Sequence, residues 1–393
     1  MSKIRGRVVT PDGVLEGAVV TLTGGRVAQV EVPRAPVAHS HDVLELPEHL
    51  IYPGWYNLHV HGAGGLDFSD DDAHAPGAIA AYLASQGWAG FLATYLARPR
   101  ARLLDALAHL RRSVANDQPG RATALGVHFE GPFLNPEKKG SHRREDLVEP
   151  SEEVLAGMLD AVPAGLKALV TFAPELPGAD RLHAALAARG GVASIGHSQA
   201  TYAQARGAID RGVLHAVHLF NAMSPLNHRE PGVPGAFLTA HDTTCEVIPD
   251  LVHLHPAVLK LIIEARGADG AVLVTDSIAP TGLGEGSFDW AGRTVHVSGG
   301  KATLDDGTVA GSVLETQRMV SILSDLGVPP HLIARMTSRH PARALGLTDR
   351  GALAPGQVAD VTVLGPDHRP ALTLVAGRVA FVNPEVSKGS SCC

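Results

Sequence analysis

The feature that most constrains the fold is a regular alternation of strand-like and helix-like segments through the middle of the chain. Ala- and Leu-rich stretches with helical periodicity, such as 75–86, 101–115 and 178–189, separate most of the apolar runs that read as strands. The eight runs are 55–61, 88–95, 123–130, 166–173, 191–197, 213–219, 243–250 and 270–276. Eight alternations over this length favour an α/β fold of the closed, TIM-like (β/α)8 barrel type.

A doubly wound open sheet is the alternative to a barrel. It would need a Gly-rich phosphate loop after the first strand, and the HGAGG sequence at 61–65 does not match GxGxxG. Short strands with turn signals occur at both ends of the chain. We therefore expect a small β-sandwich domain from 1–52 and 350–388, a barrel over 53–349, and a disordered tail over 389–393.

Composition excludes several classes of protein. Hydrophobic residues make up 45% of the chain, but no uninterrupted apolar run approaches the ~20 residues that span a bilayer. The first residues lack the apolar length of a signal peptide, which favours a cytoplasmic location. Cys245, Cys392 and Cys393 cannot form a disulfide framework. The net charge of −7, without a Lys/Arg stripe, argues against nucleic acid as a partner.

Side chains of metal-binding type stand at the ends of the predicted strands. They are His59, His61, Glu130, His197, His218 and Asp276. Because the carboxyl ends of barrel strands meet at one face, where such folds carry their chemistry, this placement predicts a metal centre there.

The His-x-His spacing is weak evidence by itself, since a chain with this His content should show roughly one such pair by chance. The pairs present are His39/His41, His59/His61 and His253/His255. Only His59 and His61 end an apolar run, and residues i and i+2 of a strand point to the same side. Taken alone, the pair could equally be two structural histidines.

The other strand-end residues carry more weight. A carboxylate such as Glu130 at the end of an apolar strand is costly to bury unless it binds a cation or an ionic partner. With His197 and His218 on successive strands it forms a mixed His/carboxylate set typical of a catalytic zinc site with an open position. Asp276 could carry protons beside a metal-bound water, or cap the segment that follows it. These features indicate a metal-dependent hydrolase.

Several longer motifs then resemble one family. They are PGWYNLHVHG, HFEGPFLNPEKKGSH, SIGHSQAT, HLFNAMSPLNHREPG, DLVHLHP, LVTDSIAPTG and GALAPGQVADVTVL. Together they cover nearly the whole chain and resemble the N-acetylglucosamine-6-phosphate deacetylases of the amidohydrolase superfamily. The resemblance implies hydrolysis of the acetamide of N-acetylglucosamine 6-phosphate, giving glucosamine 6-phosphate and acetate.

The resemblance also implies roles at the reacting centre. Glu130, His197 and His218 would hold the main catalytic metal, most simply zinc, with iron as an alternative. Asp276 would be the general base and then the acid that protonates the departing amine. His142 would polarise the acetyl carbonyl.

Further roles concern the substrate. Asn221 and Ala222 would contact it, with backbone N–H groups facing the phosphate. Arg229 would pair with the phosphate from a neighbouring subunit, which implies a homodimer. His253 would contact sugar hydroxyls.

Two departures from the family pattern bear on the site. The retained His59/His61 pair allows a second metal, bridged by Glu130 and also bound by Asp276. Asn57 replaces the Asp usual in PGxxDxHxH, so we expect weaker support for that position. Leu251 replaces Gly in the DGxH motif, and its bulk is expected to narrow or reshape the sugar pocket.

Other functions stay open at this stage. Relatives that act on cyclic amides or dipeptides commonly bridge two metals with a carboxylated lysine, whereas Glu130 takes the bridging place here. A non-catalytic scaffold relative would tend to have lost ligands. The choice between gluco- and galacto-configured sugars does not follow from the sequence.

Overall fold

The large domain is built on a sheet of eight parallel strands, as predicted. The computed structural model describes residues 2–34, 42–116 and 118–389. The strands are β5 (Trp55–Val60), β8 (Trp88–Leu96), β9 (Thr123–Glu130), β10 (Lys167–Phe172), β11 (Val192–Ile195), β12 (His215–Ala216), β13 (Thr244–Val247) and β14 (Ala271–Leu273), and they pair in this order. Every residue of β5 and β8 is buried, as expected for strands covered on both faces.

The barrel closes between its first and last strands just beyond the end of β14. The backbone N–H of Asp276 donates to the carbonyl of His59 at 2.9 Å. The buried Asn57 side chain donates to the Thr275 hydroxyl at 2.7 Å and accepts, at 3.3 Å, from the backbone N–H of Thr275. Asn57 therefore fastens β5 to the end of the last strand.

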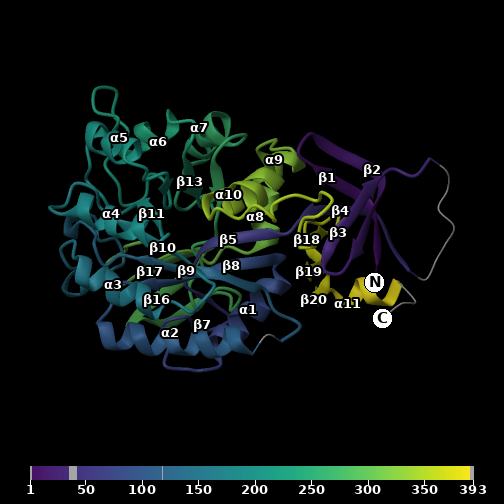
Figure 1. Cartoon of the computed structure of the whole chain (residues 1–393), viewed down its shortest axis with the longest axis horizontal. Helices are drawn as coiled ribbons and strands as arrows, with labels where there is room; N and C mark the ends of the chain where they lie inside the picture. The colour runs from purple at the N-terminus through teal and green to yellow at the C-terminus, as the bar shows by residue number, and fades with distance from the viewer. Residues whose placement is uncertain (1, 35–41, 117, 390–393) are drawn as a thin grey trace.

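Helices surround this sheet (Figure 1). They are α1 (Ala75–Ser85), α2 (Arg100–Ala115), α3 (Glu152–Ala161), α4 (Ala179–Ala188), α5 (Tyr202–Asp210), α6 (Gly232–Leu238), α7 (Pro256–Arg266), α8 (Thr316–Asp325), α9 (Pro330–Ala334), a π-helical turn η3 (Arg335–Arg339) and α10 (His340–Ala344). The helices predicted at 75–86, 101–115 and 178–189 correspond to α1, α2 and α4. A capping box at Thr201 and Gln204 starts α5.

Both ends of the chain contribute to one further sheet, which lies to one side of the barrel in Figure 1. Its strands are β1 (Lys3–Thr10), β2 (Gly13–Thr23), β3 (Arg26–Glu31), β4 (Val43–Pro53), β18 (Val361–Leu364), β19 (Pro370–Val375) and β20 (Arg378–Val382), followed by α11 (Pro384–Gly389). Strand β4 joins the two ends, because it pairs in parallel with β1 and antiparallel with β18. The small β unit from both termini is thus confirmed.

The exact domain boundaries stay a prediction. The tail expected to be disordered lies outside the described residues from position 390 onward, as do His39 and His41.

A three-stranded antiparallel sheet that the sequence did not predict lies between β14 and α8. It comprises β15 (Gly286–Trp290), β16 (Arg293–Ser298) and β17 (Lys301–Leu304). Its Trp290 indole donates to Asp67 at 2.7 Å, next to the short hairpin β6 (Gly62–Ala63) and β7 (Leu66–Asp67). This contact brings the insertion over the end of the barrel that carries the candidate site.

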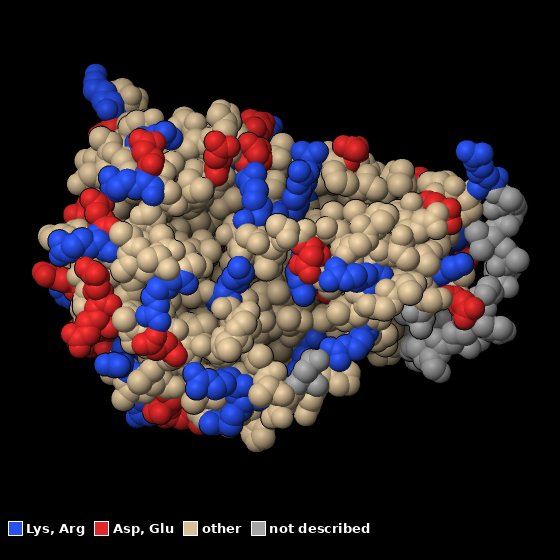
Figure 2. All heavy atoms as spheres, viewed as in Figure 1, with Lys and Arg blue, Asp and Glu red and all other residues tan. Residues whose placement is uncertain are grey.

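Within the described ranges, none of the helices combines the length and the apolar character that crossing a bilayer requires. On the face shown in Figure 2, Lys and Arg side chains are interspersed with Asp and Glu.

Candidate metal centre

The six predicted side chains come together at the carboxyl ends of the barrel strands. Glu130 is the last residue of β9, and the other five stand at or just after the ends of β5, β11, β12 and β14. They form two compact groups whose ligand atoms lie within 4.8 Å of one another, and all six are buried. The groups are Glu130, His197 and His218, and His59, His61 and Asp276.

Three of these residues leave their strands through a left-handed backbone conformation. The φ angle is 49° at His197, 27° at His218 and 51° at Asp276. For residues other than glycine this conformation costs roughly 1–2 kcal/mol each. Such strain persists where the surrounding structure enforces it, and it concentrates at functional sites. The backbone is therefore less stable at these residues than in a regular conformation, and this conformation sets the direction of their side chains.

Glu130 lies at the centre of the first group. Its Oε1 is 3.0 Å from Nε2 of His197 and 3.0 Å from Nε2 of His218, and the two histidine nitrogens are 3.1 Å apart. Its Oε2 is 3.1 Å from Nε2 of His142. Burial favours the neutral acid, but the histidines around it, His142 foremost, outweigh burial and hold the pKa of Glu130 well below its usual range.

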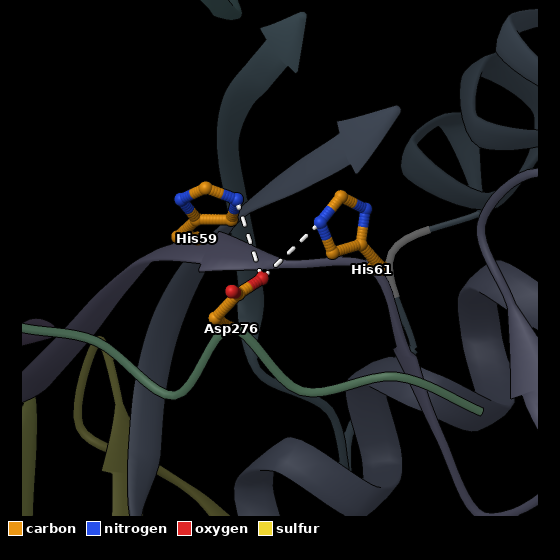
Figure 3. Close-up of side chains that lie close together, drawn as sticks. All are labelled: His59, His61 and Asp276. Carbon is orange, nitrogen blue, oxygen red and sulfur yellow. Dashed lines mark ion pairs between the residues drawn. The ribbon is translucent and has the colours of Figure 1, made fainter. Parts of the chain in front are cut away.

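The second group contacts the same carboxylate. Nε2 of His59 is 3.5 Å from Oε1 of Glu130, and Nε2 of His61 is 3.5 Å from its Oε2. Oδ1 of Asp276 is 3.4 Å from His59 and 3.3 Å from His61, and Figure 3 shows both rings turned toward this oxygen. Glu130 therefore stands between the two groups, where a bridging carboxylate would stand.

The hydrogen bonds at Nδ1 of His197 and of His59 indicate that the site suits a cation. Nδ1 of His197 is 2.7 Å from the carbonyl oxygen of Lys138, which can only accept, so the proton of the neutral ring is on Nδ1. Nδ1 of His59 is likewise 2.8 Å from a carboxylate oxygen of Glu246. Neutral rings would present Nε2 lone pairs to these carboxylate oxygens. Burial opposes a charge on His59, but Asp276, Glu246 and Glu130 outweigh it and raise the pKa of His59 well above its usual value, and Nε2 of His59 has no hydrogen-bond partner. A divalent cation bound by these N and O atoms would take the place of that positive charge among the carboxylates.

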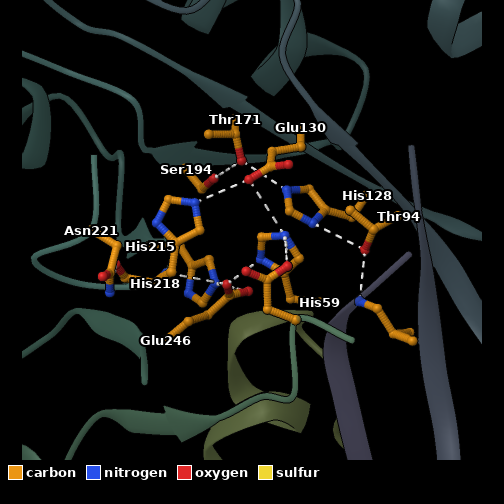
Figure 4. Close-up of polar contacts among 12 residues, drawn as sticks. His59, Thr94, His128, Glu130, Thr171, Ser194, His215, His218, Asn221 and Glu246 are labelled. Carbon is orange, nitrogen blue, oxygen red and sulfur yellow. Dashed lines mark hydrogen bonds and ion pairs between the residues drawn. The ribbon is translucent and has the colours of Figure 1, made fainter. Parts of the chain in front are cut away.

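A group of buried polar side chains lies beside His59, on the strands that follow β5. His128 contacts the Thr94 hydroxyl at 3.3 Å and the Thr171 hydroxyl at 2.8 Å, and Thr171 continues to Ser194 at 2.7 Å (Figure 4). Burial, and then the neighbouring His59, hold the pKa of His128 well below its usual value. His128 is thus a neutral, hydrogen-bonded core histidine on the same strand as Glu130.

A cavity of about 330 Å³ opens onto the two groups. Its wall includes Asn221, Ala222 and His253, which were expected to contact the substrate. Nδ1 of His253 is 2.7 Å from Asp250, whose charge outweighs burial and raises the pKa of His253. The rest of the wall is formed by His61, Glu130, Glu137, Lys138, Gly140, Ser141, His197, His218, Asp276, Trp290, Thr308, Val309 and Gly311.

Other expected site residues lie elsewhere. Arg229 is in an exposed loop and does not line this cavity. His142 does not line it either, but it contacts Glu130 from behind, and burial lowers the pKa of its ring to about 4, so it is neutral.

The structure shows what the two residues that depart from the family pattern contact. Leu251 does not line the cavity, and it packs instead against the core with a left-handed φ of 63°. Its effect is therefore on the backbone rather than on pocket width. Asn57 closes the barrel through Thr275 and accepts from the backbone N–H of His59 at 3.3 Å, so it supports the first strand rather than either imidazole ring.

Sequence reasoning missed a pair of buried residues behind the centre, Glu246 and His215. Glu246 lies within β13, and His215 begins β12. A signal was available, because a glutamate inside the apolar run TTCEVI is as costly to bury as Glu130.

Known proteins resemble this chain in sequence over most of its length. The sequence pattern of the amidohydrolase family matches residues 50–380. An N-acetylglucosamine-6-phosphate deacetylase of Bacillus subtilis (strain 168) is 32% identical over 385 residues, which is 97% of each chain. An N-acetylgalactosamine-6-phosphate deacetylase of Escherichia coli O157:H7 is 34% identical over 91% of this chain and 93% of that protein.

A solved structure gives the same result in three dimensions. It is a point mutant of the Mycobacterium smegmatis N-acetyl-D-glucosamine-6-phosphate deacetylase in complex with N-acetyl-D-glucosamine-6-phosphate. It matches with a TM-score of 0.88 and 31% identity over 97% of this chain and 99% of that one. The family pattern spans most of the chain, and these relatives cover nearly all of it, so the chain belongs to the amidohydrolase family.

Proposed function

We propose that this protein is a metal-dependent deacetylase that converts N-acetylglucosamine 6-phosphate into glucosamine 6-phosphate and acetate. The observation that carries the proposal is Glu130, which stands between two buried His/carboxylate groups at the wall of a cavity. The relatives named for this reaction cover nearly the whole chain.

The reaction needs an activated water and a proton for the leaving amine. A divalent cation supplies this chemistry when bound, because it lowers the pKa of a coordinated water toward ~7 and polarises the carbonyl under attack. Asp276, buried beside His61 and lining the cavity, takes the proton from the attacking water. It then delivers that proton to the amide nitrogen as the C–N bond breaks, which leaves acetate and the free amine.

The remaining side chains orient the substrate. His142 polarises the acetyl carbonyl in this proposal; its ring is neutral, donates from Nε2 to Glu130 and does not line the cavity, so the role requires the ring to turn toward the bound substrate. Asn221 and the backbone N–H of Ala222 face the phosphate, and His253 contacts sugar hydroxyls. Arg229 is exposed in its own chain, which fits a role at the cavity of a second subunit in a homodimer.

The cofactor proposal is zinc, with one or two ions per subunit and iron as the alternative, since mixed His and carboxylate ligands suit both. The protein works on a small phosphorylated sugar in the cytoplasm, without nucleic acid or membrane partners. Glu130 in the bridging place also disfavours the lysine-bridged cyclic-amide and dipeptide relatives.

A second candidate differs only in the sugar. The Escherichia coli O157:H7 relative, named for N-acetylgalactosamine 6-phosphate, is as similar to this chain as the gluco-named ones. Acetate release from both phosphorylated sugars, and from unphosphorylated N-acetylglucosamine, tests these proposals. We expect the gluco-configured phosphate to give the highest kcat/KM. Equal rates with and without the phosphate would contradict its role, and a preference for the galacto sugar would favour the second candidate.

A further inference from the structure

The buried carboxylate of Glu246 contacts both sides of the metal centre from behind. It is fully buried within β13. Its Oε2 is 2.8 Å from Nδ1 of His59 and 3.4 Å from the backbone nitrogen of His218, and its Oε1 is 3.2 Å from Nε2 of His215 (Figure 4). None of the roles assigned above to the reaction uses this side chain.

His215 holds the other oxygen of Glu246. Because a carboxylate oxygen accepts, Nε2 of His215 donates to Oε1 of Glu246 at 3.2 Å. On the opposite side of the ring, Nδ1 of His215 is 2.6 Å from the Thr244 hydroxyl. The carboxylate is thereby oriented with its other oxygen toward His59.

The consequence for His59 is a fixed tautomer. An acceptor at Nδ1 keeps a proton there, so Nε2, which faces Glu130 and Asp276, is the nitrogen left to bind a cation. A carboxylate behind a metal-binding imidazole also increases its basicity. The first group contacts Glu246 only through the backbone N–H of His218 at 3.4 Å, and the imidazole of His197 is held instead by the carbonyl of Lys138.

We infer that Glu246 is the positioning residue that prepares His59 to bind a cation, and that this contact makes the second metal position of the site. The inference rests on the metal centre of the proposed function. It predicts that loss of Glu246 empties the position of His59, His61 and Asp276 and leaves the position of Glu130, His197 and His218 filled.

The test is the metal content of the full chain after loading with zinc and removal of free ion. We expect two ions for the wild type and one for Glu246→Leu. Glu246→Gln can still accept from His59 while His215 shifts its proton to Nδ1, so we expect two ions with the second bound about tenfold more weakly, at the low end of such effects. Thr244→Val removes the hydroxyl contacts to His215 and Leu214 but not the contact between Glu246 and His59, so it is the matched control and should keep both ions.

Cobalt-loaded protein and anomalous diffraction show which position is lost, a result that general loosening of the core would not give. Two ions of wild-type affinity in Glu246→Leu, or a single ion in the wild type, would overturn the inference. If Glu246→Leu does not fold, unchanged affinity for the second ion in Glu246→Gln overturns it instead. Acetate release by the wild type judges the proposed function separately, since these ion counts do not depend on turnover.

Discussion

His340 makes the stability of the fold depend on pH in a way that can be calculated. It lies at the start of α10, almost fully buried, and its Nδ1 donates to the carbonyl of Ala271 at 2.7 Å. Burial lowers the pKa of His340 from 6.5 to about 4, and the nearby Arg343 adds to this. In the folded state the ring is therefore neutral over a pH range in which the unfolded chain is protonated.

The direction of the pH dependence of stability follows from the number of protons that each state binds. Between about pH 6.5 and pH 4 the unfolded chain binds more protons at this site, so folding stability falls as the pH falls. At pH 5 the loss relative to pH 8 is about 2 kcal/mol, from the shift of the pKa to about 4. An unfolding entropy of about 0.8 kcal/mol/K for a chain of this size turns this loss into a Tm decrease of about 2–3 °C.

The assay compares the Tm of the wild type and of His340→Asn by calorimetry at both pH values. The asparagine amide can replace the Nδ1 donor but does not titrate. Between pH 8 and pH 5 the Tm of the variant should therefore fall about 2–3 °C less than the Tm of the wild type. Proton binding elsewhere in the chain is common to both proteins and cancels in the comparison. His74→Asn changes an exposed histidine and should leave the pH dependence unaltered. An identical Tm decrease in wild type and His340→Asn would refute the reasoning.

Other predictions concern the site. Asp276→Asn should reduce kcat by several orders of magnitude. Elemental analysis should show that the variant still binds at least the ion held by Glu130, His197 and His218. Near-normal turnover would mean that Asp276 is not the proton carrier. Arg229→Ala should raise KM for the phosphorylated sugar about 10–100-fold, because a charged hydrogen bond is lost, and change kinetics on the unphosphorylated sugar little. A parallel loss on both sugars would argue against phosphate binding. Asn57→Leu should lower unfolding free energy by about 3 kcal/mol, measured in urea, because it leaves buried groups of Thr275 and His59 unpaired; an unchanged midpoint would mean that Asn57 does not fasten the barrel.

Much of the barrel was predictable because burial and periodicity are local signals. The apolar runs ending at Glu130 and Asp276 marked strands, and the rule that parallel barrel strands place their ends at one face brought distant residues together. The Ala-rich helices showed their period directly.

Other features depend on contacts between distant segments. The strands of the insertion, such as Gly286–Trp290, are short and partly exposed, so they lack the apolar signal of the barrel strands. The bond from Asn57 to Thr275 joins residues far apart in sequence, and no pattern near Asn57 reveals its partner. Glu246 was within reach of sequence reasoning, but its link to His59 follows only from the closed barrel.

The central claim is that the His/carboxylate centre at the barrel mouth deacetylates a phosphorylated amino sugar through a bound cation. The most direct test measures acetate released from N-acetylglucosamine 6-phosphate by the native chain, by chain stripped with a chelator, and by stripped chain supplied again with zinc or iron. The account predicts turnover in the first, its loss in the second and its recovery in the third. Undiminished turnover by chain shown by elemental analysis to be free of metal would contradict it.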